Sequence, residues 1–332
     1  MTTSGTASAV KPPIGPSRSG RAARLRASAI REYGIVVSFL IVFVTLALTS
    51  DAFLTTTNLL AMLDQTAPIG IMAVGGTLVF IAGGFDLSVG AIFAISGVLA
   101  AQAVDSVGPE LAIVLGSLVG LGFGLANGLL VTAARINPFI ATLGSQLVIR
   151  GLAVVLTGGY LVSVGDPGFT KFGQGELLGL KYGIWLWAAF ALAAGFVLQR
   201  TTLGRYIFAS GGNPEAARLS GVRVQHIRAI TFVISGFAAS LAGVLVASRV
   251  ATGQADAGTA IEFTVIAGIV IGGVSIFGGE GAIWRCILGV LLLTMIGNGF
   301  NLLNIEAIYS QIFQGGIILL AVAVDAWSRR NP

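Results

Sequence analysis

Long apolar runs separated by short polar stretches set the pattern of this chain. A membrane helix needs roughly 20 mostly apolar residues, and runs of that size without Asp, Glu, Lys or Arg recur along the sequence. Nine of them cover residues 34–50, 65–85, 87–104, 111–134, 182–199, 229–248, 263–279, 286–305 and 307–324, and a further run, 136–156, is broken only by Arg150. The pattern predicts an all-α integral membrane protein with about ten transmembrane helices.

The positive charges predict the orientation of these spans. Ten spans place both termini on one side, and the segments of that side hold most of the basic residues: Lys11, Arg18, Arg21, Arg24, Arg26, Arg31, Arg135, Arg200, Arg205, Arg218, Arg223, Arg228, Arg285, Arg329 and Arg330. The other side keeps only Lys171, Lys181 and Arg249. Because positive loops stay in the cytoplasm, both termini are expected to be cytoplasmic.

Composition agrees with a membrane protein and excludes several other classes. Of the 332 residues, 55% are hydrophobic and 10% are charged, against about 25% charged in soluble domains. The net charge of +5 lies in loops and tails, so no nucleic-acid-binding face is expected. The single Cys286 and single His226 exclude a disulfide framework within one chain and a Cys/His metal site.

Three regions follow from the polar segments. Residues 1–32, rich in Ser, Pro, Gly and Arg, are expected to form a disordered basic cytoplasmic tail. A cleaved signal peptide is the alternative, but no small-x-small cleavage site follows the first span and nine more spans do. Residues 33–327 are expected to form the polytopic domain, with a polar cytoplasmic loop at 200–228, and 328–332 the cytoplasmic C-terminus.

Charges and helix breakers near the spans are the first functional candidates, because a charge within a bilayer costs on the order of 3 kcal/mol. Asp86 lies between two spans, and it either caps the next helix with Ser88 or contacts substrate. Arg150 and Asp64 are interpreted as helix-end residues. Proline and glycine in the second span (Pro68, Gly70, Gly75 and Gly76) predict a bent or unwound helix. A glycine-rich pattern at 272–281 is related to 83–90 and suggests internal duplication.

The loop at 200–228 contains residues in the order that a short capped helix requires. Asn213 suits the N-cap, Pro214 the first helical position, Glu215 the positive helix start and Gly221 the position after the end. A helix of about two turns outside the membrane has no core of its own. The apolar Ala216, Ala217 and Leu219 therefore predict a partner surface.

Two motifs make the chain resemble the inner-membrane permease subunits of bacterial ABC importers for ribose, xylose and arabinose. The first is Gly84-Phe85-Asp86-Leu87-Ser88-Val89-Gly90, in which Phe85 replaces the isoleucine of the family. The second is matched at Gly211, Gly212, Asn213, Glu215, Ala216, Ala217, Leu219, Ser220 and Gly221. The resemblance extends over residues 33–327 and implies a type II ABC importer-like fold. It also implies that residues 212–221, Arg218 included, couple the chain to an ATPase.

The resemblance further implies a set of partners. They are an ABC ATPase that holds ATP and Mg, an extracytoplasmic sugar-binding protein, and a second permease copy or a paralogue. This chain would bind no cofactor and would lie in the bacterial inner membrane. No Gly-x4-Gly-Lys-Ser/Thr loop occurs in it, so the chain itself is expected not to be an enzyme. Two alternatives remain open: a permease for branched-chain amino acids, and an ion-coupled carrier using Asp86 or Arg150.

A small neutral sugar needs hydrogen-bond partners in the spans and no fixed charge. The amides in or beside the spans are the candidates for such a path: Gln65, Asn127, Asn137, Gln146, Asn298 and Asn301. The alternative for each amide is a hydrogen bond between helices, which contributes about 0.6 kcal/mol on average.

Overall fold

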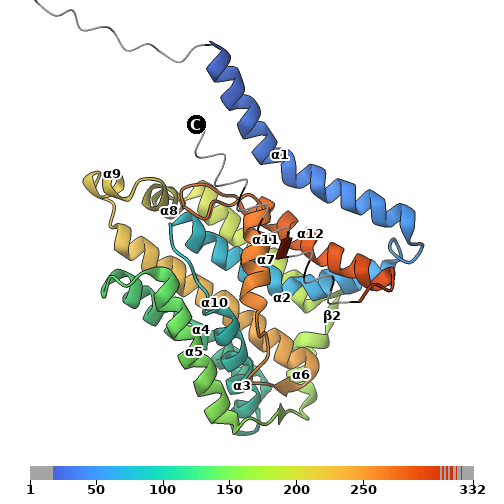
Figure 1. Ribbon diagram of the computed structural model, residues 1–332. Helices are drawn as coiled ribbons and strands as arrows, with labels where there is room; N and C mark the ends of the chain where they lie inside the picture. The colour runs from blue at the N-terminus through green and yellow to red at the C-terminus, as the bar shows by residue number, and fades with distance from the viewer. Residues whose placement is uncertain are drawn as a thin grey trace, which may run out of the picture.

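A computed structural model describes residues 18–306 and, beyond them, residues 309, 312, 315, 316, 319 and 323, with side chains from Tyr33 onward. The chain is mostly helical (Figure 1). Within these described residues, seven helices are long and apolar enough to cross a membrane: α2 (Thr56–Ile81), α3 (Val89–Val107), α4 (Pro109–Thr132), α5 (Pro138–Thr157), α7 (Tyr182–Arg200), α10 (Val224–Val250) and α12 (Ile283–Leu302). The protein is therefore a multi-pass membrane protein.

The predicted count of ten spans is not confirmed. Seven predicted spans coincide with the seven long helices, and the first coincides with the apolar part, Tyr33–Thr49, of α1 (Arg18–Thr49). Residues 18–32, expected to be disordered, are a helical extension of that span, while residues 1–17 lie outside the described part. The predicted span at 307–324 and the C-terminus at 328–332 also fall largely or wholly outside it.

The predicted span at 263–279 is a much shorter helix, α11 (Ile261–Ile271). Its 11 residues rise about 16 Å, roughly half of a bilayer core. The helix ends at a glycine pair, in which Gly273 has a φ of 74° that favours glycine. The run at 263–279 is therefore apolar throughout, yet its helix ends at Ile271, which hydropathy alone does not indicate.

The centre of the bundle is α10, which packs against α2, α3 and α4. Contact with α4 is backbone to backbone, because a Cβ at Gly120 or Gly124 would overlap backbone atoms of α10. The predicted unwinding of α2 is wrong, since α2 is one continuous helix through Pro68. Its glycines instead allow close packing: Gly70 lies against the Trp187 ring of α7.

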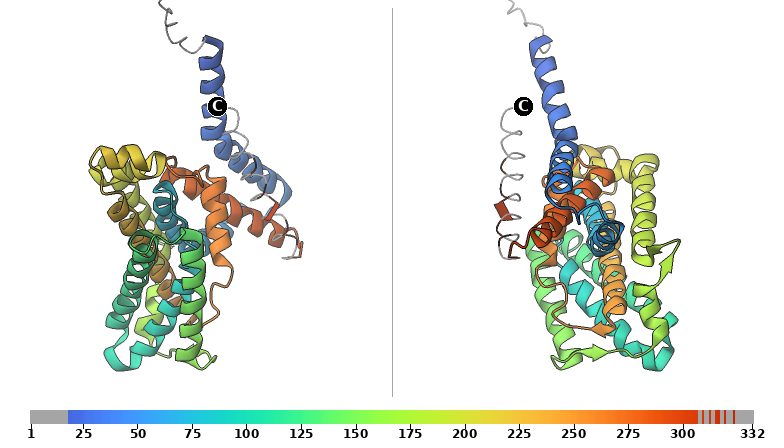
Figure 2. Two further views of the ribbon diagram at one scale, coloured as in Figure 1. Left: turned by 60° about the vertical axis from the view of Figure 1, so that its left-hand side comes forward. Right: turned by 90° about the vertical axis from the view of Figure 1, so that its right-hand side faces the viewer.

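Short elements cap the two ends of the bundle (Figure 2). The helices α8 (Thr202–Gly212) and α9 (Pro214–Leu219) lie at one end, and α6 (Pro167–Gln174) lies toward the other. Strand β1 (Val162–Ser163) pairs antiparallel with β4 (Thr252–Gly253), and β2 (Glu176–Leu177) pairs antiparallel with β3 (Leu180–Lys181). The β1–β4 pair joins the connection after α5 to the segment that precedes α11.

Candidate functional site

Helix α9 is capped as its sequence predicts. The Asn213 side chain accepts a hydrogen bond from Ala216 N at 3.0 Å, Pro214 is the first helical residue, and Gly221 follows the helix with a φ of 86°. Glu215 and Arg218 form an exposed ion pair at 2.8 Å. These local contacts hold a helix of six residues in place at the end of the bundle.

The apolar residues of α9 divide between two environments. Ala217 is 6% exposed and packs on the rest of the chain, whereas Leu219 is 81% exposed. A large apolar side chain presented on a short surface helix is suited to a pocket on another protein.

Beneath α8 and α9, three segments meet through five glycines, Gly83, Gly211, Gly212, Gly278 and Gly279, which we name the glycine junction. A Cβ at Gly211 would overlap the carbonyl oxygen of Ile81, the last residue of α2, and a Cβ at Gly278 would lie 2.9 Å from Gly83 Cα. The backbones of the α2 end, the α8 end and the α11–α12 loop are thus in direct contact.

Two hydrogen bonds close the glycine junction. Gly279 N donates to Ile81 O at 2.9 Å, which joins the α11–α12 loop to α2. Arg228 Nε, from the first turns of α10, donates to Ala82 O at 3.0 Å. The segments touch through their backbones, with few side chains between them that could rearrange. A displacement of α8 is therefore expected to move α2 and the loop before α12 as well. The two related glycine patterns of the sequence, 83–90 and 272–281, are therefore in contact at the glycine junction.

Asp86 lies just beyond the glycine junction in a buried hydrogen-bond network. Its Oδ1 accepts from Ser88 N at 3.0 Å and from Ser88 Oγ at 2.6 Å, and its Oδ2 accepts from Ser235 Oγ at 2.8 Å. Asn127 Nδ2 donates to Ser88 Oγ at 2.7 Å. At 4% exposure and with three hydrogen bonds, the carboxylate ties the α2–α3 connection to α4 and α10.

The other residues of this motif serve the same packing. Ser88 is the N-cap residue of α3, but its own side chain makes no capping hydrogen bond. The N–H of Leu87 donates to Thr142 Oγ1 of α5 at 3.1 Å. A Cβ at Gly84 would lie 2.9 Å from the Val79 side chain, and one at Gly90 would overlap the Glu262 carboxylate.

Asp86→Ala is expected to destabilise the protein, because it leaves the buried Ser88 N–H and Ser235 hydroxyl without an acceptor. Each unpaired group costs roughly 1–3 kcal/mol. Asp86→Asn keeps one acceptor and offers an N–H that Ser235 Oγ can accept, so its loss should be smaller. Thermal unfolding in detergent measures both variants, and equal losses would contradict the network.

The structure does not bring the six candidate amides into one site. Asn137 caps α5 and accepts from Phe139 N at 3.0 Å, and Asn127 belongs to the Asp86 network. Gln65 and Asn301 are exposed on different helices. Only Gln146 meets a charged group, since its Nε2 donates to Glu262 Oε1 at 2.6 Å.

Asn298 pairs with Asn58, an amide outside the set of six candidates. Its Nδ2 donates to Asn58 Oδ1 at 2.8 Å, and Asn58 Nδ2 donates back to Asn298 Oδ1 at 3.2 Å. This reciprocal pair joins α12 to α2.

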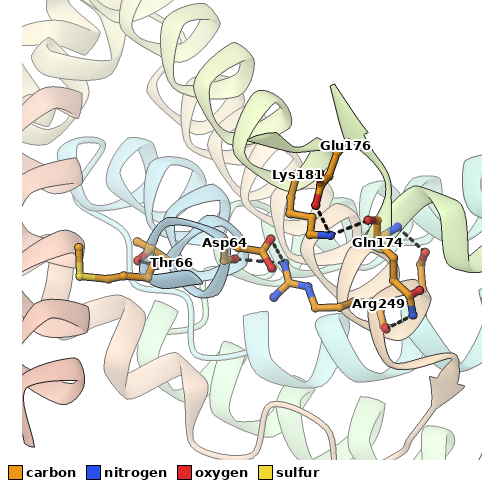
Figure 3. Close-up of polar contacts among 9 residues, drawn as sticks. Asp64, Thr66, Gln174, Glu176, Lys181 and Arg249 are labelled. Carbon is orange, nitrogen blue, oxygen red and sulfur yellow. Dashed lines mark hydrogen bonds and ion pairs between the residues drawn. The ribbon is translucent and has the colours of Figure 1, made fainter. Parts of the chain in front are cut away.

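A polar cluster that the sequence did not indicate joins α2, the end of α10, α6 and the β2–β3 hairpin (Figure 3). Asp64, expected to be a solvated helix end, forms an ion pair with Arg249 at 2.9 Å. Lys181 pairs with Glu176 at 2.7 Å, and Gln174 Nε2 donates to Arg249 O at 2.9 Å. A cavity of about 250 Å³ lies beside the cluster, between α2, the β2–β3 hairpin and α7.

Among the residues that the structure describes, no group of three or more His, Cys, Asp or Glu side chains could hold a metal ion.

The described part of the chain is a bundle of membrane-crossing helices with a capped, exposed helix at one end. In comparison with known proteins, residues 58–322 match the family described as branched-chain amino acid transport system / permease component. The chain belongs to this family. No solved structure gives a significant match.

Curated relatives cover almost the whole chain. The ribose import permease protein RbsC of Escherichia coli K12 is 39% identical over 304 residues, which is 89% of this chain and 94% of the relative. The L-arabinose ABC transporter permease protein AraH of Azospirillum brasilense is 39% identical over 303 residues, 91% and 89% of the two chains. The RbsC of Bacillus subtilis 168 is 38% identical over 300 residues, 89% and 93%. The resemblance indicated by the two motifs is confirmed.

Proposed function

We propose that this chain is the permease subunit of an ATP-driven, binding-protein-dependent importer of a monosaccharide or related polyol. The relatives at 38–39% identity are ribose and arabinose permeases, which favours a sugar over a branched-chain amino acid. An ion-coupled carrier is disfavoured, because Asp86 is buried and held by three hydrogen bonds within the bundle. The observation that carries the mechanism is the exposed α9 resting on the glycine junction.

The proposal divides the work among several chains. ATP and Mg are held by a separate ABC ATPase, since this sequence has no phosphate-binding loop. An extracytoplasmic binding protein delivers the sugar, and a second permease, either a copy or a paralogue, completes the path. The positive-inside pattern supports placing both termini, and with them α9, on the cytoplasmic side of the bacterial inner membrane.

The residues of the coupling segment then have distinct roles. Leu219 enters the ATPase surface, and the Asn213 cap and the Glu215–Arg218 pair keep α9 folded while it is pushed. The movement of α8 and α9 passes through the glycine junction to α2 and to the loop before α12. From there the Asp86 network passes it to α4 and α10, so that access alternates between the two sides.

Leu219→Asp tests this function. The substitution should reduce co-purification of the ATPase subunit and sugar uptake at least tenfold, because it places a charge in an apolar contact. Leu219 is 81% exposed, so folding and insertion should be unchanged. The measurement is mass spectrometry of the tagged complex, together with uptake of labelled ribose and arabinose.

The matched control is Leu178→Asp, at an equally exposed leucine (84%) in the hairpin away from α9. This variant should retain the ATPase. If Leu219→Asp retains it as well, α9 is not the ATPase contact. If no ATPase co-purifies with the parent chain, the importer assignment itself fails.

A further inference from the structure

The non-helical segment that precedes α11, residues 251–260, packs along α3 with Gly253 and Ala255 buried, while Gln254, Asp256, Thr259 and Ala260 are exposed. A Cβ at Gly253 would lie 2.8 Å from the Ala101 Cβ, and one at Gly258 would lie 2.8 Å from the Phe93 ring. The segment thus follows α3 from Ala101 to Phe93, which is about two turns, before α11 begins. Irregular backbone at membrane depth is tolerated where it is buried in protein or lines a water-filled cavity.

The first turn of α11 carries a buried carboxylate that lacks half of its partners. Glu262 is 3% exposed, and its Oε1 accepts from Gln146 Nε2 at 2.6 Å. Its Oε2 has no hydrogen-bond partner among the described residues. This oxygen lies against Gly90 of α3, where any side chain would overlap it. The absence of a side chain at Gly90 therefore makes room for the Glu262 carboxylate.

Arg150 joins the cluster one turn of α5 after Gln146. Its guanidinium Nη1 donates to Ala255 O at 2.7 Å and to Ala257 O at 2.8 Å, which fastens the irregular segment. It also interacts electrostatically with Glu262 and Asp256. The expectation that Arg150 is a helix-end residue reaching a headgroup is thus wrong. Of the two carboxylates near the guanidinium, Asp256 is exposed and Glu262 is buried. Arg150 therefore balances the buried charge of Glu262, and this part of the cluster suits a neutral ligand.

The depth of the cluster excludes a simple surface role. Gln146 is the ninth of the 20 residues of α5, and its side chain and that of Arg150 are partly exposed. Polar side chains in mid-span face the bundle interior or a water-filled cavity. Discontinuous helices that start near mid-membrane form substrate sites in other transporters.

We propose that Gln146 and Glu262, with Arg150 as the balancing charge, bind hydroxyl groups of the sugar within the translocation path. The unpartnered Glu262 Oε2 accepts from one hydroxyl, and the partly exposed Gln146 amide serves a neighbouring hydroxyl. Carboxylate and amide groups together match the alternating donors and acceptors of a polyol. This inference rests on the proposed function and adds to it the residues that contact substrate.

Cysteine labelling tests whether the cluster faces water. The parent chain has one cysteine, Cys286, and it is 1% exposed, so an introduced cysteine is the accessible one. In the assembled importer, Gln146→Cys should react with a charged methanethiosulfonate reagent at least tenfold faster than Leu147→Cys. Leu147 is the next residue on α5 and is 70% exposed, which suits contact with lipid. Equal rates, or no reaction at position 146, would overturn the proposal.

Uptake with deoxy sugars tests the contact itself and does not depend on the cysteine variant. In the reconstituted importer, Glu262→Gln should lower uptake of D-ribose or L-arabinose at least tenfold. The parent importer should take up the monodeoxy derivatives of the transported sugar less well than the sugar itself. For at least one derivative, this difference in uptake should disappear in Glu262→Gln. The control Glu110→Gln, at an exposed residue of α4, should leave uptake and this preference unchanged.

The two levels of the proposal fail differently. If the parent importer moves neither sugar, the proposed function fails. If the parent transports and Glu262→Gln stays within twofold of it with every deoxy preference intact, the contact is overturned while the importer function stands.

Discussion

Gly120→Ala should largely abolish the folded, extractable protein. A Cβ at position 120 of α4 would overlap the carbonyl oxygen of Gly236 in α10, and a Cβ at Gly236 would overlap the carbonyl of Gly120. Both obstacles are backbone, so no rotamer change relieves them. Overpacking of a core costs typically 1–3 kcal/mol, and we expect a loss of about 3 kcal/mol or more here because α4 must move away from the central helix.

Gly122→Ala is the matched control for that loss. The site lies two residues along the same helix, and a Cβ there meets nothing within 4 Å. Alanine is favoured over glycine in a helix by roughly 0.5–1 kcal/mol, so this variant should be as stable as the parent or slightly more stable. Size-exclusion profiles and thermal unfolding in detergent compare the two, and similar profiles would refute close α4–α10 contact.

Gly211→Ala should abolish sugar uptake while the protein still inserts and binds its ATPase. The added methyl group would overlap the carbonyl oxygen of Ile81, which also accepts the hydrogen bond from Gly279 N. The end of α8 must then separate from α2, and the glycine junction loses its contact. Leu219 and the cap of α9 lie beyond the change, so the surface offered to the ATPase remains.

Paired assays separate coupling from assembly in this variant. Co-purification of the ATPase should stay near the parent value, and uptake of labelled ribose or arabinose should fall at least tenfold. Gly195→Ala in α7, where a Cβ meets nothing within 4 Å, should behave as the parent. Full uptake by Gly211→Ala would mean that movement of α8 does not travel through the junction.

The features that the sequence predicted are those set by local chemistry. Seven spans follow from long apolar runs, six of them unbroken and one interrupted only by Arg150, whose burial in lipid does not depend on tertiary contacts. The start and end of α9 follow from Asn213, Pro214 and Gly221, since a cap needs only its own residues. Close packing at Gly120 and Gly124 is the common use of small residues in membrane helices.

The features that the sequence did not predict depend on contacts between distant segments. Glu262 stands directly before the predicted span at 263–279, so hydropathy does not single it out, although its carboxylate is buried against α3 and α5. The signal that could have found it is a lone acid directly before an apolar run that ends in a glycine pair. The glycine junction is formed by the end of α2, the end of α8 and the α11–α12 loop, which are far apart in the sequence and meet only in the tertiary fold.

The Asn58–Asn298 pair has a consequence for how the bundle can move. Each amide both donates to and accepts from the other, so sliding α12 along α2 by one turn, about 5.4 Å, would strand two amides in an apolar surrounding. The reciprocal hydrogen bonds therefore oppose translation of α12 along α2, while the two helices can still tilt. We therefore expect α2 and α12 to travel as one rigid body during transport, with the change in access produced by the helices that surround them.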